Sequence, residues 1–118
     1  MDKVNISDKF GLFTEHWTPK IIGELNENNI LLAKAKGEFV WHTHEEDEMF
    51  VVIKGKLVIK LRDRDVRLSE GELFVVPKGV EHCPLAEEEV HIMLIEPKVT
   101  KHTGELVTEQ TVNTYERI

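Results

Sequence analysis

Cysteine is almost absent from this 118-residue sequence, long apolar runs are missing, and positive charge is nowhere concentrated. The single cysteine, Cys83, excludes an intramolecular disulfide. The longest apolar runs, MFVVI and IMLI, are as long as a strand and far shorter than a membrane span. The net charge of −7, without a lysine- or arginine-rich stretch, argues against binding to nucleic acid.

The first ten residues show no basic region followed by an apolar one, which is the pattern of an export signal. A single cysteine also fits a reducing compartment, so the sequence predicts a cytoplasmic protein. With 41% apolar and 31% charged residues, the composition is that of a soluble globular protein. A chain of this length builds one hydrophobic core, and we therefore expect a single domain over residues 1–118.

What the sequence does contain, from residue 20 onward, is a series of short strand-like segments separated by turn residues. The turn signals recur roughly every 8–12 residues, which is typical of an all-β sandwich or barrel. Gly55 separates two such segments and predicts a hairpin. Residues 48–53 are apolar without clear alternation, which predicts a strand buried on both faces. The expected strands are KIIGEL, ILLAKAK, EMFVVIK, KLVIKLRD, DVRL, ELFVVP and EVHIMLIEP.

The two ends of the chain carry weaker signals. Near the N-terminus, SDKF predicts a single helical turn with Ser7 or Asp8 as its N-cap. From Lys98 onward the sequence is polar and without periodicity, so this tail is either a loosely held arm or a segment that wraps on a partner.

The segment WHTHEEDEMF, residues 41–50, is the first one that points to chemistry. Strand alternation places His42 and His44 on one face and turns Phe39, Trp41 and Thr43 the other way. Two readings remain open, a solvated polar turn or half of a metal site, since two imidazoles alone rarely hold a metal. Glu48, at the entry of the next strand, could add a carboxylate.

The second segment, GELFVVPKGVEHCP, covers residues 71–84 and supplies a further histidine. Pro77 ends a strand, Gly79 allows a turn, and His82 begins the next strand. The order Gly37, His42-x-His44, Glu48, Gly55 and then Gly71, Pro77-x-Gly79, His82 resembles the two motifs of the cupin superfamily. Four residues separate Gly37 from His42, where five are usual. Ala86 stands where the second motif often has asparagine.

This resemblance implies a double-stranded β-helix (a jelly-roll barrel) with a core at about residues 28–97 and short N- and C-terminal extensions. It also implies a divalent metal, Fe, Mn, Ni, Co or Zn, held by His42, His44, Glu48 and His82 in the mouth of the barrel. An octahedral metal would keep two positions open for an oxygen donor or O₂. Glu48 is either a fixed ligand or a group that detaches and acts as a general base.

The walls of the expected pocket follow from alternation alone. Phe50 and Val52 share the face of Glu48 and are expected to form the floor, with Phe74 and Met93 as walls. His91 either lines this pocket or is a hydrogen-bonded histidine of the core or surface. His16 and His102 lie outside the site segments, and no role is assigned to them.

Cys83 and Trp41 lie next to the candidate ligands in the sequence. Cys83 is expected to be a small buried hydrophobic residue rather than a nucleophile. Trp41, on the outer face of its strand, needs cover from the N-terminal segment or from a second subunit, and small cupins commonly dimerise. The sequence therefore predicts a homodimer.

Three functions fit these features. The first is a metal-dependent oxygenase or isomerase that acts on a small organic substrate able to chelate the metal through oxygen. The second is a protein that binds a small molecule through the metal without turnover. The third is a structural protein with a vestigial site, and the intact set of four ligands argues against it.

Overall fold

The computed structural model describes residues 2–118, and the regular secondary structure of this part is almost entirely strand, as predicted. No helix within these residues is long and apolar enough to cross a membrane. The described elements are α1 (Ile6–Phe10), β1 (Lys20–Leu25), β2 (Asn28–Glu38), β3 (Glu48–Lys54), β4 (Leu57–Leu61), β5 (Asp65–Leu68), β6 (Leu73–Val76), β7 (His82–Pro97) and β8 (Glu116–Arg117).

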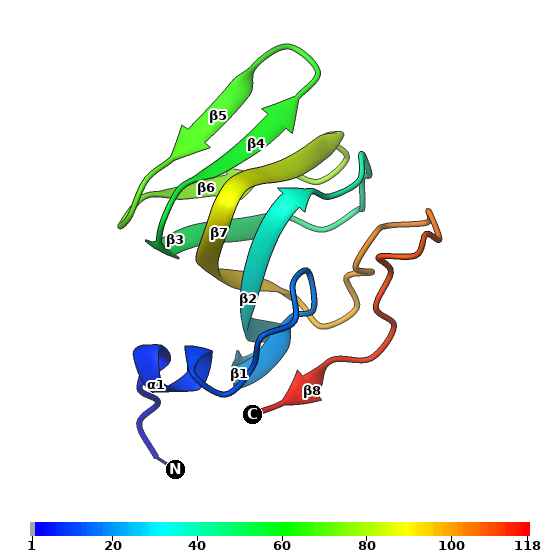
Figure 1. Cartoon of the computed structure of the whole chain (residues 1–118). Helices are drawn as coiled ribbons and strands as arrows, with labels where there is room; N and C mark the ends of the chain where they lie inside the picture. The colour runs from blue at the N-terminus through cyan, green and yellow to red at the C-terminus, as the bar shows by residue number, and fades with distance from the viewer. Residues whose placement is uncertain (1) are drawn as a thin grey trace.

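The long strand β7 organises the barrel. Along one edge it pairs with β2 in antiparallel register, from Asn28 opposite Pro97 to Glu38 opposite Leu85. Along its other edge the start of β7 pairs with β4 and its later part pairs with β3. Figure 1 shows the result: β4 and β5 lie at one end of the molecule, and α1, β1 and β8 lie at the other. The predicted jelly-roll fold is confirmed.

The hairpin predicted across Gly55 is wrong. β3 pairs with β6 and β7, whereas β4 pairs with β5 and β7, so the chain passes at Gly55 from one part of the barrel to another. Gly55 has a φ of 96°, and a Cβ atom there would lie 3.2 Å from the carbonyl oxygen of Glu89. A glycine between two strand patterns therefore marks a tight corner, but it does not say which strands pair.

The core fills the inside of the barrel. On β3, Phe50 and Val52 are buried inside, while Val51 and Ile53 on the outer face are only half-buried. The expectation that this strand is buried on both faces is therefore wrong, because the outer face has only partial cover. The buried core residues are Leu31, Ala33, Ala35, Phe50, Val52, Leu57, Ile59, Leu68, Val76, Ala86, Val90, Ile92 and Leu94.

The partial cover on the outside comes from the N-terminal segment. Phe10 of α1 and Phe13 pack with Leu32 of β2 in a second, smaller apolar cluster. The helix is capped by Asn5, whose side chain accepts a hydrogen bond of 2.9 Å from the Asp8 N–H. The predicted caps, Ser7 and Asp8, lie inside the helix instead, because Asn5 already has the extended backbone that an N-cap requires.

The C-terminal tail, residues 98–118, packs against its own barrel, so the expectation of a loosely held arm is wrong. β8 pairs in parallel with β1, and the Ile118 N–H donates to the Ile21 carbonyl at 3.0 Å. The Lys9 ammonium donates to the Ile118 carbonyl at 2.7 Å. Thr103, within the tail, is 1% exposed. These contacts hold the tail beside the barrel, where it contributes to the site described next.

Candidate metal centre

Two loops meet at one end of the barrel. Residues 39–47 connect β2 to β3, and residues 77–81 connect β6 to β7. The Gly79 N–H donates to the His44 carbonyl at 2.9 Å, and the Lys78 N–H donates to the Asp47 carboxylate at 2.8 Å. His42 and His82 also form an antiparallel bridge. Backbone hydrogen bonds therefore fix the two segments against each other.

This arrangement brings together the four side chains that the sequence singled out. One donor atom from each of His42, His44, Glu48 and His82 lies within 4.8 Å of all the others. Glu48 Oε1 is 3.3 Å from His44 Nε2 and 3.5 Å from His82 Nε2. None of the four residues is more than 9% exposed, and His82 is fully buried. They are thus not the solvated turn residues of the alternative reading.

The backbone determines which nitrogen of each imidazole faces inward. The Nδ1 atoms of His42 and His82 lie 2.9 Å from the carbonyls of Val40 and Val80, and that of His44 lies 3.0 Å from the Glu46 carbonyl. A carbonyl only accepts, so each Nδ1 carries the proton and donates it. Each Nε2 is then left with its lone pair, and this hydrogen-bond pattern is typical of histidines that bind a metal.

The Nε2 atom of His82 supplies the test of whether a metal fits. It is buried and has no hydrogen-bond partner among the described residues. A buried polar atom without a partner is costly, and a cation held by His82 and its three neighbours would satisfy it. Three imidazoles and a carboxylate are donors that suit Fe, Mn, Ni, Co and Zn. The residues therefore fit a divalent transition metal.

The electrostatics of the cluster favour neutral imidazole at His42 and a carboxylate at Glu48. Burial, together with the neighbouring His82, lowers the pKa of His42 to about 4. Burial works to raise the pKa of Glu48, but the adjacent His44 and His82 imidazoles and the Glu96 carboxyl group hold that pKa well below its ordinary value. Burial works to lower the pKa of His44, but the hydrogen bond and charge of Glu48 outweigh it and raise that pKa.

Glu96, at the end of β7, is a site residue that the sequence reasoning missed. It is 4% exposed, it lines the cavity with Glu48, and its Oε2 is buried without a hydrogen-bond partner among residues 2–118. Burial and the charge of Glu48 raise the pKa of Glu96 well above its ordinary value. Burial therefore favours the protonated form of Glu96 beside the Glu48 carboxylate.

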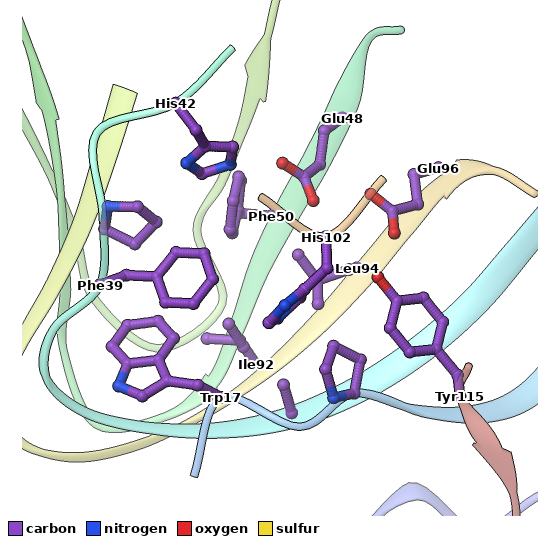
Figure 2. Close-up of a pocket in the computed structure, with 13 residues that line it drawn as sticks. Trp17, Phe39, His42, Glu48, Phe50, Ile92, Leu94, Glu96, His102 and Tyr115 are labelled. Atoms are coloured by element: carbon purple, nitrogen blue, oxygen red, sulfur yellow. The ribbon is translucent and has the colours of Figure 1, made fainter. Parts of the chain in front are cut away.

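A small cavity with a free volume of about 40 Å³ lies beside His42 and Glu48. Figure 2 shows its lining side chains, with Trp17 and Phe39 on one side and Tyr115 and Glu96 on the other. The rings of Trp17 and Phe39 are stacked, with their centroids 4.8 Å apart. The apolar lining residues are Trp17, Pro19, Ala33, Phe39, Phe50, Pro84, Ile92 and Leu94. The polar ones are His42, Glu48, Glu96, His102 and Tyr115.

The sequence matches the cupin domain family over residues 30–98, which is more than half of the chain. The protein belongs to the cupin family. A crystal structure of a cupin-2 domain containing protein from Shewanella frigidimarina is 51% identical with a TM-score of 0.79, and the match covers 80% of this chain and 94% of that one.

Two curated relatives match a shorter part of this cupin. The uncharacterized protein YdbB of Bacillus subtilis is 36% identical over 52% of this chain and 56% of its own. The acireductone dioxygenase of Tuber melanosporum is 30% identical over 55% of this chain and 38% of its own. The chain thus spans about half, or less, of the length of these relatives.

Of the four pocket residues predicted for this cupin, only Phe50 lines the cavity. Val52 lies in the core at 0% exposure, and Phe74 packs against that core. Met93 packs in the outer cluster with Phe10 and Phe13. Its neighbours on β7, Ile92 and Leu94, face the cavity instead. The expectation for Met93 is therefore wrong, because side chains one residue apart on a strand point to opposite faces.

Phe39 was expected to point away from the ligands, and this is wrong. It lines the cavity, and its ring lies edge-on to that of His42 with centroids 5.5 Å apart. Residues 39–47 form a loop that includes one isolated bridge rather than a strand, so alternation does not apply to them. His102 and Tyr115 were missed as well, since the aperiodic tail gave no signal that its side chains reach the site.

Two further histidines, His91 and His16, lie outside the cavity. His91 stacks on Phe10, with ring centroids 4.4 Å apart, and pairs with Glu89 at 3.5 Å. It is therefore a histidine of the outer face, as one of the two readings held. His16 pairs with Glu89 at 2.7 Å.

Cys83 and Trp41 complete the comparison with the sequence. Cys83 is fully buried, as expected of a small hydrophobic residue, and burial together with the charge of Glu38 raises the pKa of its thiol to about 11. Trp41 is covered by Arg62, whose guanidinium carbon lies 3.8 Å from the ring centroid. Within the chain, the cover thus comes from a cation of the same barrel rather than from the N-terminal segment.

Proposed function

We propose that this cupin binds a divalent transition metal through His42, His44, Glu48 and His82, and that it transforms a small organic substrate as an oxygenase or isomerase. The substrate would chelate the metal through two oxygen atoms. Once bound, the metal would supply Lewis-acid polarisation of those oxygens or, in the case of iron, activation of O₂. Which of Fe, Mn, Ni, Co or Zn is the native metal is a question for metal analysis.

The observation that carries the proposal is the buried Nε2 of His82, which has no hydrogen-bond partner among the described residues and faces three further donors. The match to an acireductone dioxygenase supports an oxygenase over other metal-dependent activities. That match covers 38% of the relative, so the reaction itself belongs to the proposal.

The chain's own residues have distinct tasks in this proposal. The three backbone carbonyls at Val40, Glu46 and Val80 keep the imidazoles in the tautomer that binds a cation. Glu96, which lines the cavity with Glu48, would keep its proton and direct it at the Glu48 carboxylate, which orients that carboxylate. Phe39 and Trp17 exclude water from the side of the cavity opposite Glu96.

The test is to prepare metal-free protein, reload it with Fe(II) or Mn(II), and measure O₂ uptake and product formation with a panel of enediols, hydroxyketones and catechols. We expect turnover of at least one compound by the loaded wild type and none by His82→Ala. His16→Ala, whose side chain lies outside the cavity, is the matched control and should retain the wild-type rate. Turnover that is equal in the presence and absence of metal would contradict the proposal.

A metal-dependent binding protein without turnover is the second candidate, and the state of His102 favours it. Its Nδ1 accepts a hydrogen bond of 3.0 Å from the Val112 N–H. With Nδ1 engaged by this backbone donor, His102 is held as a wall of the cavity and does not offer that nitrogen as a base. Tight binding of a panel compound without product would support this second function.

The homodimer and the cytoplasmic location expected from the sequence stay predictions. For the dimer, the outer face of β6 is the candidate contact, because Leu73 and Val75 are 56% and 43% exposed there. Sedimentation velocity would test it. We expect Val75→Glu to produce monomers, whereas Val107→Glu, at an 84% exposed position of the tail, should leave the dimer intact. A wild type that sediments as a monomer would refute the dimer.

A further inference from the structure

The cavity beside the candidate metal centre is small because two of its walls come from the C-terminal tail, residues 98–118. His102 and Tyr115 line it together with the barrel residues. Figure 2 shows the ring of His102 between Phe39 and Tyr115. The centroid of the His102 ring is 4.9 Å from that of Phe39 and 6.1 Å from that of Tyr115.

The size of the cavity limits what can lie beside Glu48. Its free volume is about 40 Å³. A cavity that holds benzene in a protein interior measures roughly 150 Å³. The docked tail therefore leaves less room beside Glu48 than a cavity that holds a six-membered ring. A chelating group with a small substituent comes much closer to this volume.

The tail is locked in this position at Gly104. Gly104 has a φ of 62°, and a Cβ atom built on it would collide with the backbone carbonyl oxygen of Thr43. Thr43 lies between the candidate ligands His42 and His44, so the tail touches the metal loop itself. Glycine is required at this contact, both for its φ and for the close approach of the two backbones.

The far end of the tail is attached independently. Residues 116 and 117 pair with β1, and Arg117 forms an ion pair with Glu24, which also pairs with Lys98 at the start of the tail. Residues 102 and 115 thus lie between fixed points, which accounts for the defined position of both rings. The match to the cupin domain family ends at residue 98, so these two rings lie outside the matched region.

We propose that the C-terminal tail makes this cupin selective for small chelating molecules, with His102 and Tyr115 as the residues that set the size limit. This inference rests on the proposed function, since the metal centre holds the chelating end of the molecule. The apolar lining, Phe39, Ile92 and Leu94 among it, surrounds the other end. That end is accordingly compact and without charge.

The test uses two hydroxamates with the same chelating group, acetohydroxamate with a methyl substituent and benzohydroxamate with a phenyl ring. Their dissociation constants are measured on Co(II)-loaded protein from the change in the visible spectrum of the metal. We expect the wild type to prefer acetohydroxamate by tenfold or more. His102→Ala, Tyr115→Ala and Gly104→Ala should each reduce this preference at least tenfold, the first two by removing a wall and the third by undocking the tail.

Val107→Ala is the control within the tail, because Val107 is 84% exposed and lines no part of this cavity. It should keep the wild-type preference. Circular dichroism and the Tm show whether each variant is folded. A wild type that binds both hydroxamates equally would overturn the inference. So would folded His102→Ala and Gly104→Ala proteins that both keep the wild-type preference.

A second experiment distinguishes failure of the metal centre from failure of the size limit. If the wild type binds no Co(II), the proposed function fails, and the size limit is then judged on the metal-free protein by NMR titration with phenol. Phenol at millimolar concentration should leave the wild-type spectrum unchanged and should bind His102→Ala. Binding of phenol by the wild type, or by neither protein, would overturn the inference without reference to the metal.

Discussion

The backbones of His42 and His82 form a reciprocal pair of hydrogen bonds. The His42 N–H donates to the His82 carbonyl at 3.1 Å, and the His82 N–H donates to the His42 carbonyl at 3.0 Å. Their imidazole rings consequently lie 4.3 Å apart, centroid to centroid. Backbone interactions thus hold the two loops together and bring the candidate ligands to one point.

The first prediction concerns removal of the metal. Because backbone interactions hold the two loops together, the metal-free protein should keep the far-UV circular dichroism spectrum of the loaded protein. Added metal should then raise the Tm by mass action, by on the order of 10 °C at a free concentration near 100 times the Kd. His82→Ala should show no such rise. Loss of the β signal on chelation would show instead that folding requires the metal.

The second prediction separates the two roles of Glu48. Its Oε1 lies close to the Nε2 atoms of both His44 and His82, so we expect Glu48→Gln to weaken metal binding more than tenfold. Calorimetric titration of the metal-free proteins with metal measures the change in affinity. Glu45→Gln, an exposed neighbour in the same loop, is the control. If metal affinity survives and only the rate falls, by about 10²–10⁴-fold, Glu48 acts as a base.

The third prediction concerns pH and Glu96. Burial and the Glu48 charge raise the pKa of Glu96 in the folded protein above its unfolded value. Between those two pKa values the folded state binds more protons, so the free energy of unfolding falls as the pH rises. Glu96→Gln removes the titrating group and with it this fall in the free energy of unfolding. In metal-free protein, the variant should therefore gain in Tm relative to wild type between pH 5 and pH 8.

Thermal unfolding followed by circular dichroism measures this gap in Tm. Each 1 kcal/mol corresponds to roughly 4 °C in a domain of this size, so the gap at pH 8 should be several degrees. Glu88→Gln, at an exposed position of the same strand, should show the same change of Tm with pH as the wild type. A Tm gap that stays constant from pH 5 to pH 8 would argue against a raised pKa at Glu96.

The fourth prediction concerns Cys83. Its thiol is buried, and burial with the charge of Glu38 raises its pKa to about 11, so the reactive thiolate is scarce at pH 8. A disulfide reagent at pH 8 should modify the folded protein at least 100-fold more slowly than the protein in guanidinium chloride. The release of the coloured thiolate product measures both rates. Fast modification of the folded protein would restore Cys83 as a candidate nucleophile.

Local pattern was sufficient for two features of this protein. The strand segments follow from apolar runs bounded by turn residues, because a strand that packs on the core has to carry apolar side chains itself. The four candidate ligands, His42, His44, Glu48 and His82, follow from the resemblance of the two segments that hold them to the cupin motifs. Glu96 was within reach as well, because it continues the inward face of Ile92 and Leu94 on β7.

Partners distant in the sequence were decided only by the tertiary structure. Gly55 predicted a turn but not that β3 and β4 pair with other strands, because strand pairing depends on the whole barrel. Alternation failed at Phe39, where the backbone is a loop, and at Met93, where a shift of one residue reverses the face. His102 and Tyr115 carried no local signal at all, since the tail acquires its position from contacts with β1 and Thr43. The sequence by itself therefore determined which atoms can bind a metal, and only the folded chain decided what surrounds them.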